Sequence, residues 1–498
     1  MKTIMQKYSS LEEIPVYDVL VIGAGMTGAI ILRELSRFNL RIVVVEKDTQ
    51  PGLGVTRTSL SYIHRNHVNP PGSLRAKLCH GSQESFRALS AELGLGYREA
   101  DEINIAFNKE QASHVRQRMD WGIKNGETTF RVISNEEVAR IEPSLNQDFI
   151  FATISKDHGM IHPPEWAFVL IENARKNNAD AFFETEVTAI KHAPDGNWNV
   201  GTNRGTLRAR YVINAAGVYA DHIAHIVGDR DINQFMARST FAIFDSSIAS
   251  IINHIVYVGG LNPAWSQSIS QTLHGNLLLG LGHFQTPDNP IDTKVTREEL
   301  EDLLRMGKEM IPSLPLNQLI TSFAGMRLTN NLGANGDFYI GPSSVAPTLF
   351  HTLICPPGIT AAPGIAREML NILSNAGLDL KEKPDFQGYR DPGYRFHYAT
   401  DIERNAAIKK NPACGHLVCR CEQVSEAEIR DAIRRGATTI DGVKQMTRAG
   451  MGRCQGGFCS PLVLKLLSEE LDIPPEKVTR KGKGSEELVA WDEIKEEQ

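Results

Sequence analysis

Near the start of the chain, the pattern of apolar and polar positions predicts a strand, a helix and a second strand. Residues 16–28 read VYDVLVIGAGMTG, a nearly continuous apolar run that ends in three glycines. The next stretch, GAIILRELSRF, has apolar residues at helical spacing, and RIVVVEK supplies another apolar run. Continuous apolar runs of this length are typical of strands buried on both faces. The pattern predicts a parallel sheet covered by helices.

The three glycines form the pattern G-x-G-x-x-G at Gly23, Gly25 and Gly28. The pattern follows a strand and opens a helix, and Glu46 ends the next strand, which is the context of a dinucleotide fold. Glycines let the backbone approach a pyrophosphate at a helix N-terminus, and a carboxylate at Glu46 can accept hydrogen bonds from a ribose. FAD and NAD both remain compatible with this unit alone.

Later hydrophobic patterns predict a second, strand-rich region. Residues 182–217 contain FFETEVTAI, WNVGTN and RARYVINAAGVYAD, which read as a hairpin followed by a buried strand. Residues 230–330 contain the β-like runs TFAIFD, HIVYVG and NLLLGLG, then a charged helix around TREELEDLLRMGKEM. Residues 336–376 predict a return to the first region, with a short strand, a turn at Gly358 and a helix that begins near Thr360.

Four of the seven cysteines lie near the C-terminal end as C-x-C and C-x4-C: Cys419, Cys421, Cys454 and Cys459. Four thiolates gathered by two loops hold either a tetrahedral zinc ion or an iron–sulfur cluster. One intervening residue is short for a zinc knuckle, which favours a 2Fe-2S cluster. The set is complete without Cys414, so we interpret that residue as structural. Cys79 and Cys355 read as isolated buried cysteines.

The composition limits the classes of partner. The chain has 498 residues, 41% of them hydrophobic, and a net charge of −6. This lack of basic excess does not favour nucleic acid or an anionic membrane surface. No apolar run reaches the length of a membrane span and no signal peptide is evident, so we expect a cytoplasmic protein with reduced thiols.

Several of these segments together resemble one family. VLVIGAGMTG, VINAAGVYAD, PPGITAAPGIA, PGSLRAKL and VCRCEQVSE with RAGMGRCQGGFCSP are similar to signatures of D-amino-acid-oxidase-like (DAO-type) flavoproteins. Among DAO-type flavoproteins, the chain resembles the proteins that are related to the large subunit of anaerobic glycerol-3-phosphate dehydrogenase. These proteins end in a BFD-like 2Fe-2S domain. It implies bound FAD and a 2Fe-2S cluster. A second strand-GxGxxG-helix unit is not evident, so a separate NAD site is not expected.

The implied fold is α/β: a Rossmann-like FAD-binding domain with an inserted antiparallel substrate domain, followed by a small, mainly helical cluster domain. The expected FAD-binding parts are 15–90, 151–230 and 331–380. The expected substrate-domain parts are 91–150 and the sheet at 231–330. A connector at 381–412, rich in Pro, Gly and charge, leads to the BFD-like domain at 413–480.

The resemblance also implies a set of site residues. The FAD contacts expected from it and from the glycine motif are Gly23, Gly25, Met26, Thr27, Gly28, Glu46, Lys47, Ser59, Val187, Ala216, Gly217, Gly358, Ile359 and Thr360. We expect His64 to act as a base and Arg327 to bind an anionic substrate, with His283 as a competing base. The family stretch has small residues where Arg65 and Asn66 stand, and Asn where Ser59 stands. We expect Arg65 and Asn66 to narrow the pocket or to add contacts.

Three functions follow as hypotheses. The first is a dehydrogenase of a small anionic alcohol, with glycerol 3-phosphate as the best candidate, whose hydride passes to the flavin and whose electrons leave through the cluster. The second is an amino-acid, opine or 2-hydroxy-acid dehydrogenase subunit. The third is a non-catalytic electron-transfer subunit. In each case we expect an electron-acceptor protein or partner subunit, within a homo- or hetero-oligomer.

Overall fold

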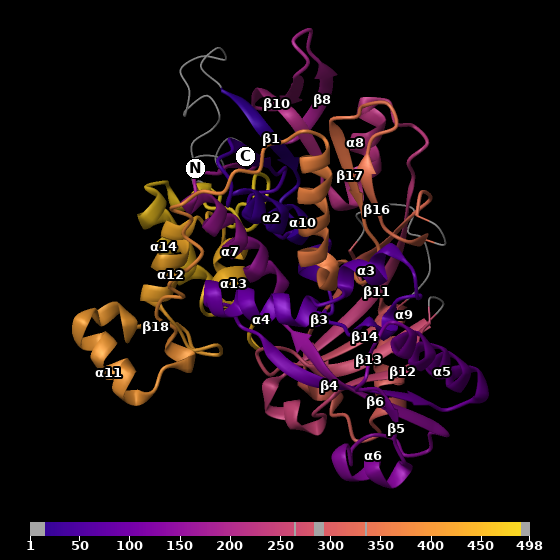
Figure 1. The fold of residues 1–498 in the computed structure, drawn as a ribbon. Coiled ribbons are helices and arrows are strands. Elements are labelled where there is room, and N and C mark those ends of the chain that lie inside the picture. The colour runs from indigo at the N-terminus through magenta and orange to yellow at the C-terminus, as the bar shows by residue number, and fades with distance from the viewer. Residues whose placement is uncertain (1–14, 263–264, 283–292, 334–335, 490–498) are drawn as a thin grey trace, which may run out of the picture.

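The computed structural model describes residues 15–262, 265–282, 293–333 and 336–489, in three connected parts (Figure 1). The first part is an eight-stranded sheet whose central strands run in the order β16-β17-β10-β1-β2-β7. The pairs from β17 to β7 are parallel, whereas β16 and the β8–β9 hairpin are antiparallel. Its strands are β1 (Val16–Ile22), β2 (Ile42–Val45), β7 (Asp180–Phe182), β8 (Val187–His192), β9 (Trp198–Thr202), β10 (Gly205–Asn214), β16 (Tyr339–Pro342) and β17 (Leu349–Leu353).

Helices cover both faces of this sheet. On one face α2 (Met26–Leu35), α7 (Pro163–Lys176) and α10 (Gly358–Asn375) share a single buried apolar core with β1 and β2. On the other face, α8 (Ala220–Val227) packs with the β8–β9 hairpin. The predicted apolar runs therefore form strands buried on both sides, as expected for a doubly covered parallel sheet.

The second part is a nine-stranded sheet in the order β15-β11-β14-β13-β12-β4-β6-β3, with β5 paired to β6. Most pairs are antiparallel, and β12–β4 is parallel. Its strands are β3 (Tyr62–Ile63), β4 (Arg98–Ala106), β5 (Arg131–Val132), β6 (Phe151–Met160), β11 (Gln234–Phe244), β12 (Ile255–Asn262), β13 (Trp265–Gln271), β14 (Leu277–Gly282) and β15 (Leu319–Asn330). The helices of this half and its junction are α3 (Leu74–Cys79), α4 (Ser82–Leu93), α5 (Lys109–Lys124), α6 (Asn135–Ile141) and α9 (Arg297–Met310).

Strand β6 belongs to a different part of the molecule from the one expected from the sequence. The sequence predicts that 151–230 belongs to the FAD-binding domain, but its first ten residues, Phe151–Met160, form β6 and pair with β4 of the second sheet. The chain re-enters the first part only at α7. The boundary was misplaced because β6 and the helix after it are joined by two residues, which leaves no linker to read in the sequence.

The third part is a compact helical domain at the C-terminal end (Figure 1). A two-stranded ribbon of β18 (Leu417–Cys419) and β19 (Val424–Ser425) precedes α12 (Glu426–Arg435), α13 (Ile440–Thr447) and α14 (Ser460–Leu471). Helix α12 begins with a capping box formed by Ser425 and Glu428. Phe168 of α7 enters the core of this domain, so the domain packs against the first part.

The connector at 381–412 lies along the first part rather than forming a free linker. The backbone N–H of Lys383 donates to the carbonyl of Arg37, and that of Arg390 donates to the carbonyl of Glu92. Its last residues form α11 (Asp401–Lys410), which begins with a capping box.

Candidate functional site

The glycine motif lies where β1, α2 and the end of β10 meet. Gly23 has a φ of +99°, and a Cβ there would lie 2.5 Å from the carbonyl oxygen of Ala215. A Cβ on Gly28 would lie 2.0 Å from the carbonyl oxygen of Gly23. Both positions therefore require glycine, because a side chain would clash with the backbone. Helix α2 begins at Met26, within this motif.

The start of α2 offers backbone donors for a pyrophosphate. The Met26 N–H donates to Thr56 Oγ1 at 3.0 Å. Within the described part of the chain, no hydrogen bond uses the N–H groups of Thr27 and Gly28. Unpaired N–H groups at a helix N-terminus favour an anion, so this turn fits the phosphates of a dinucleotide.

Glu46 directly follows β2 and lies beside this turn. Its carboxylate accepts from the N–H of Ala24 at 2.7 Å and from the N–H of Asp48 at 3.0 Å. Burial and the neighbouring Asp48 raise the pKa of the Glu46 carboxyl. The Lys47 ammonium lies over the Tyr219 ring, 4.6 Å from its centroid. The position of Glu46 fits the ribose-binding role predicted for it.

Two further predicted contact segments approach the same edge. The N–H of Thr185 donates to the Glu46 carbonyl at 2.8 Å, which brings the start of β8, at Val187, toward β2. At the end of β10, Asn214 accepts from the N–H of Ala216, and Gly217 has a φ of +58°. Val187, Ala216 and Gly217 thus lie along the carboxyl ends of β2 and β10, where ligands of open α/β sheets bind.

The third segment is the start of α10. Thr360 Oγ1 accepts from the His64 backbone N–H at 3.0 Å, which joins the first turn of α10 to the loop that carries His64. A Cβ on Gly364 would lie 2.0 Å from the Leu78 carbonyl oxygen, so α10 and α3 are in backbone contact. Gly358, Ile359 and Thr360 form the first turn of this helix, next to His64.

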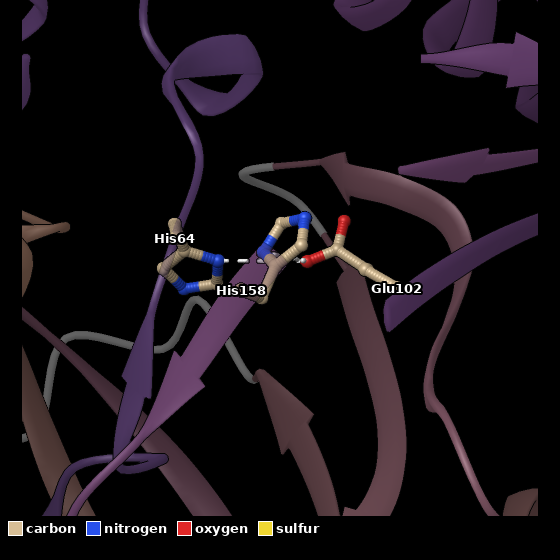
Figure 2. A group of neighbouring side chains, drawn as sticks. All are labelled: His64, Glu102 and His158. Atoms are coloured by element: carbon tan, nitrogen blue, oxygen red, sulfur yellow. Dashed lines mark ion pairs between the residues drawn. The ribbon is translucent and has the colours of Figure 1, made fainter. Parts of the chain in front are cut away.

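His64 belongs to a buried cluster around Glu102 (Figure 2). Its Nδ1 lies 3.6 Å from Glu102 Oε2, and His158 Nδ1 lies 3.5 Å from the same oxygen. His67 Nε2 is 2.8 Å from the other oxygen, Oε1. Glu102 is fully buried, and His64 is 8% exposed. Sequence reasoning identified His64 but not Glu102 or His158, because both come from strands far from it in the chain; His67, three residues after His64, was not identified either.

Arg327 lies on β15, near Tyr257, which also neighbours His64. The rings of His64 and Tyr257 are 6.2 Å apart, and the Arg327 guanidinium is close enough to Tyr257 to lower the pKa of its hydroxyl, although burial raises that pKa overall. Among the described residues, no carboxylate pairs with Arg327. The His64 imidazole and the Arg327 guanidinium therefore both lie near Tyr257.

The loop that carries Ser59 connects these residues to the glycine turn. Thr56 contacts the start of α2, and a Cβ on Gly325, two residues before Arg327, would lie 2.5 Å from Thr58 Oγ1. Ser59 Oγ accepts from the Ser61 N–H at 3.4 Å. The loop therefore spans from the nucleotide edge to β15.

Arg65 and Asn66 make their contacts with other parts of the protein. Arg65 Nε donates to Glu127 at 2.6 Å, and the Asn66 N–H donates to the same carboxylate at 2.8 Å. Asn66 Nδ2 donates to the Ala76 carbonyl. Both side chains are held by the protein, so the substitution of larger residues here does not by itself argue against a family substrate. His283 lies outside the described residues.

The four predicted cysteine ligands come together in the C-terminal domain. Cys421 Sγ and Cys454 Sγ are 3.8 Å apart, and a hydrogen bond from Cys459 lowers the pKa of Cys419 to about 6. A Cβ on Gly452 would lie 2.3 Å from the Cys421 Cβ, so only glycine lets the two loops approach. Cys419 and Cys459 are buried whereas Cys421 is exposed. Four thiols from two loops fit a 2Fe-2S cluster.

The other cysteines lie elsewhere. Cys414 is buried, and burial together with the Glu428 carboxylate raises the pKa of its thiol. Cys79 and Cys355, which the sequence suggested were isolated, are neighbours; burial raises their pKa values to about 12 and about 11. Arg75 Nη1 lies 3.7 Å from Cys355 Sγ.

Comparisons with known proteins agree with this geometry. Residues 18–372 match the model of the FAD dependent oxidoreductase (DAO) family, and residues 417–469 match the BFD-like [2Fe-2S] binding domain. The chain is 32% identical to a glycerol 3-phosphate dehydrogenase of Caloramator mitchellensis, over 94% of this chain and 97% of that protein. It is 25% identical to anaerobic glycerol-3-phosphate dehydrogenase subunit A1 of Haloferax volcanii, over 93% of this chain and 84% of that protein.

A solved structure has the same fold. It is the dithionite-reduced L-alpha-glycerophosphate oxidase from Mycoplasma pneumoniae with FAD bound, which superposes with a TM-score of 0.71 at 27% identity. The match covers 76% of this chain and all of that one. The described residues include no helix long and apolar enough to cross a membrane.

Proposed function

Because the chain belongs to the DAO family of FAD-dependent oxidoreductases and ends in a BFD-like [2Fe-2S] domain, we propose that it oxidises glycerol 3-phosphate at its secondary alcohol. The C–H and O–H bonds at this carbon break and a C=O bond forms, so the product is the corresponding ketone phosphate. Two electrons leave with the hydride, and the hydroxyl proton goes to a base. The relatives named for glycerol 3-phosphate support this substrate.

The observation that carries the proposal is the pairing of His64 and Arg327 around Tyr257. A half-buried guanidinium without a carboxylate partner among the described residues suits a phosphate, to which it can donate two parallel hydrogen bonds. The His64 imidazole, which neighbours the same ring, suits the proton of an alcohol. This arrangement brings together an anion-binding group and a base, which is what a small anionic alcohol requires.

The residues assigned to FAD are those at the glycine turn, Glu46, the end of β10 and the first turn of α10. The bound flavin supplies the hydride acceptor. The protein positions the substrate: Arg327 holds the phosphate, and Thr360 fixes the His64 backbone by accepting its N–H. In this proposal the His64 imidazole takes the hydroxyl proton.

The 2Fe-2S cluster, held by Cys419, Cys421, Cys454 and Cys459, supplies one-electron transfer. We propose that the electrons reach a partner subunit or an acceptor protein. The similarity to a protein named as a subunit of anaerobic glycerol-3-phosphate dehydrogenase supports a partner. The cytoplasmic location and the oligomeric assembly expected from the sequence remain predictions.

The test is an anaerobic titration of the purified protein with glycerol 3-phosphate, followed by the flavin absorption. Bleaching by glycerol 3-phosphate but not by glycerol is expected, because glycerol lacks the phosphate. Bleaching only by amino acids or 2-hydroxy acids would favour the second hypothesis from the sequence. A third outcome is that no substrate bleaches the flavin, while addition of the protein restores turnover to a co-purifying partner. This outcome would favour a subunit that only transfers electrons.

A further inference from the structure

The carboxylate of Glu102 is fully buried in a ring of polar side chains. Its Oε1 accepts from Asn104 Nδ2 at 2.9 Å and lies 2.8 Å from His67 Nε2. Its Oε2 has no hydrogen-bond partner within ordinary distance. A buried carboxylate oxygen without a donor is costly, so a nearby donor is expected to serve it.

Two imidazole nitrogens lie close enough to be that donor. They are His158 Nδ1 at 3.5 Å and His64 Nδ1 at 3.6 Å. His158 is already engaged, because its Nδ1 accepts from the Arg65 backbone N–H at 3.4 Å and its Nε2 lies 3.1 Å from Ser155 Oγ. A neutral His158 that accepts at Nδ1 carries its proton on Nε2 and has none to give to Glu102.

His64 Nδ1 is in the opposite situation. It is buried and has no hydrogen-bond partner among the described residues. The two unpartnered atoms, Glu102 Oε2 and His64 Nδ1, therefore face each other at a distance slightly longer than a hydrogen bond (Figure 2). Catalytic hydrogen bonds are often long in the absence of ligands and shorten when the substrate complex forms.

We propose that Glu102 is the positioning residue for His64: its Oε2 accepts the Nδ1 proton and leaves the Nε2 lone pair as the proton acceptor. This inference rests on the proposed function, in which His64 takes the hydroxyl proton. A carboxylate that fixes the tautomer and orientation of a catalytic imidazole also favours the imidazolium that forms during the reaction.

The groups around Glu102 favour its charged form, the carboxylate, which is the form that accepts the Nδ1 proton in a hydrogen bond. Burial alone raises the pKa of its carboxyl, but the histidine rings around it hold that pKa well below its usual range. The buried guanidinium of Arg118 adds a permanent positive charge nearby: burial lowers the pKa of Arg118, and Glu102 partly offsets this. The other groups that face the His64 ring are Tyr62 and Tyr257, whose ring centroids lie about 6 Å away.

The first test measures the His64 tautomer directly, by nitrogen NMR of the FAD-loaded protein with isotope-labelled histidine and without substrate. The signal is assigned by its loss in His64→Asn. We expect a protonated Nδ1 and an unprotonated Nε2, and a change of this pattern in Glu102→Gln. The opposite tautomer in the unmodified protein would overturn the proposal, whatever the substrate proves to be.

The second test is a double-mutant cycle on the rate of flavin reduction by glycerol 3-phosphate. Glu102→Gln is expected to lower this rate about 10²-fold, because the base loses its orientation. In the His64→Asn background the same change should cost less than about twofold. Equal losses in both backgrounds would mean that Glu102 acts only through structure, and would overturn the proposal.

Controls separate this inference from folding and from the proposed function. Glu99→Gln removes a carboxylate from the same strand, where it pairs with Arg87 at the surface, and should leave the rate unchanged. If Glu102→Gln fails to retain FAD, the cycle is run with Glu102→Asp, which keeps the charge but withdraws the carboxylate. If glycerol 3-phosphate does not reduce the flavin of the unmodified protein, the proposed substrate is refuted. The His64 tautomer measured by NMR would still decide the role of Glu102.

Discussion

Arg448 of the cluster domain donates a hydrogen bond to Asn276 Oδ1 at 3.0 Å, and Asn276 lies in the turn between β13 and β14. The same guanidinium pairs with Glu422, the neighbour of Cys421, at 2.7 Å. Nearby, Arg453 pairs with Asp245 at the end of β11, at 3.0 Å. The loops that carry the cysteines are thus attached to the second sheet.

We predict that Arg448→Met loosens this attachment. Loss of a half-buried, charge-assisted hydrogen bond costs about 1–3 kcal/mol. Hydrogen exchange of the β13–β14 turn and of α13 should become faster in this variant. Arg434→Met is the control, because Arg434 is exposed and pairs with Glu470 inside the cluster domain. Equal exchange in both variants would show that Arg448 does not hold the domains together.

Cys454→Ser should remove the cluster and leave FAD bound. The four cysteines lie in a domain with its own apolar core, separate from the glycine turn. The iron-to-flavin ratio and the electron paramagnetic resonance signal after reduction measure this outcome. Cys414→Ser should keep the iron, since Cys414 is not among the four. Loss of FAD in Cys454→Ser would show that the two parts fold as one unit.

Gly28→Ala should impair FAD binding. The new Cβ would lie 2.0 Å from the Gly23 carbonyl oxygen, and overpacking of this kind costs about 1–3 kcal/mol or more. Two quantities are measured: the flavin content after purification and the midpoint of unfolding. Gly201→Ala is the control, because Gly201 lies in strand β9 and a Cβ there would make only ordinary contacts with Ala189, at 3.4 Å or more. Full flavin content in Gly28→Ala would contradict the packing argument.

Arg327→Met should raise the KM for glycerol 3-phosphate roughly 10- to 100-fold, because a charge-assisted contact to the phosphate is lost. Steady-state kinetics with glycerol 3-phosphate measure the effect. Any slow reaction with glycerol serves as an internal control and should stay unchanged, since glycerol has no charge for Arg327 to bind. A proportional loss with both substrates would indicate a structural role for Arg327.

Asp229 should contribute stability that depends on acid pH. It accepts from the Ser344 N–H at 3.1 Å and lies 3.0 Å from His351 Nε2. Burial alone raises the pKa of the Asp229 carboxyl, but hydrogen bonds from Ser343, Ser344 and His351 lower it below its ordinary value. A depressed carboxyl pKa stabilises the fold above the unfolded pKa of about 4, and the contribution is lost as pH falls through the folded pKa.

Urea unfolding of the native protein and of Asp229→Asn measures this contribution. The difference in unfolding free energy between the two should be largest near neutral pH and should shrink as the pH falls below about 4. A difference that stays constant over this range would show that Asp229 acts through its shape and neutral hydrogen bonds alone.

Much of the architecture could be predicted from local patterns. The apolar run before Gly23, the glycine spacing and Glu46 after the next strand predicted the nucleotide edge, because this motif is local in the chain: a Cβ on Gly28, for example, would clash with the carbonyl of Gly23. The cysteine spacing predicted the four ligands for the same reason: both pairs come from short loops. The boundary after β6 was less predictable, because the sequence of a strand does not indicate which sheet it joins.

The environment of the base depended on the tertiary structure. The sequence by itself determined the family, the cofactor-binding turns and the identity of His64 and Arg327 as candidates. It did not determine that Glu102 and His158 would meet His64, because β4 and β6 approach it only through pairing across the second sheet. Nor did it determine that Glu127 would hold Arg65 and Asn66. Which polar side chains become neighbours is decided by long-range packing, and local periodicity carries no information about it.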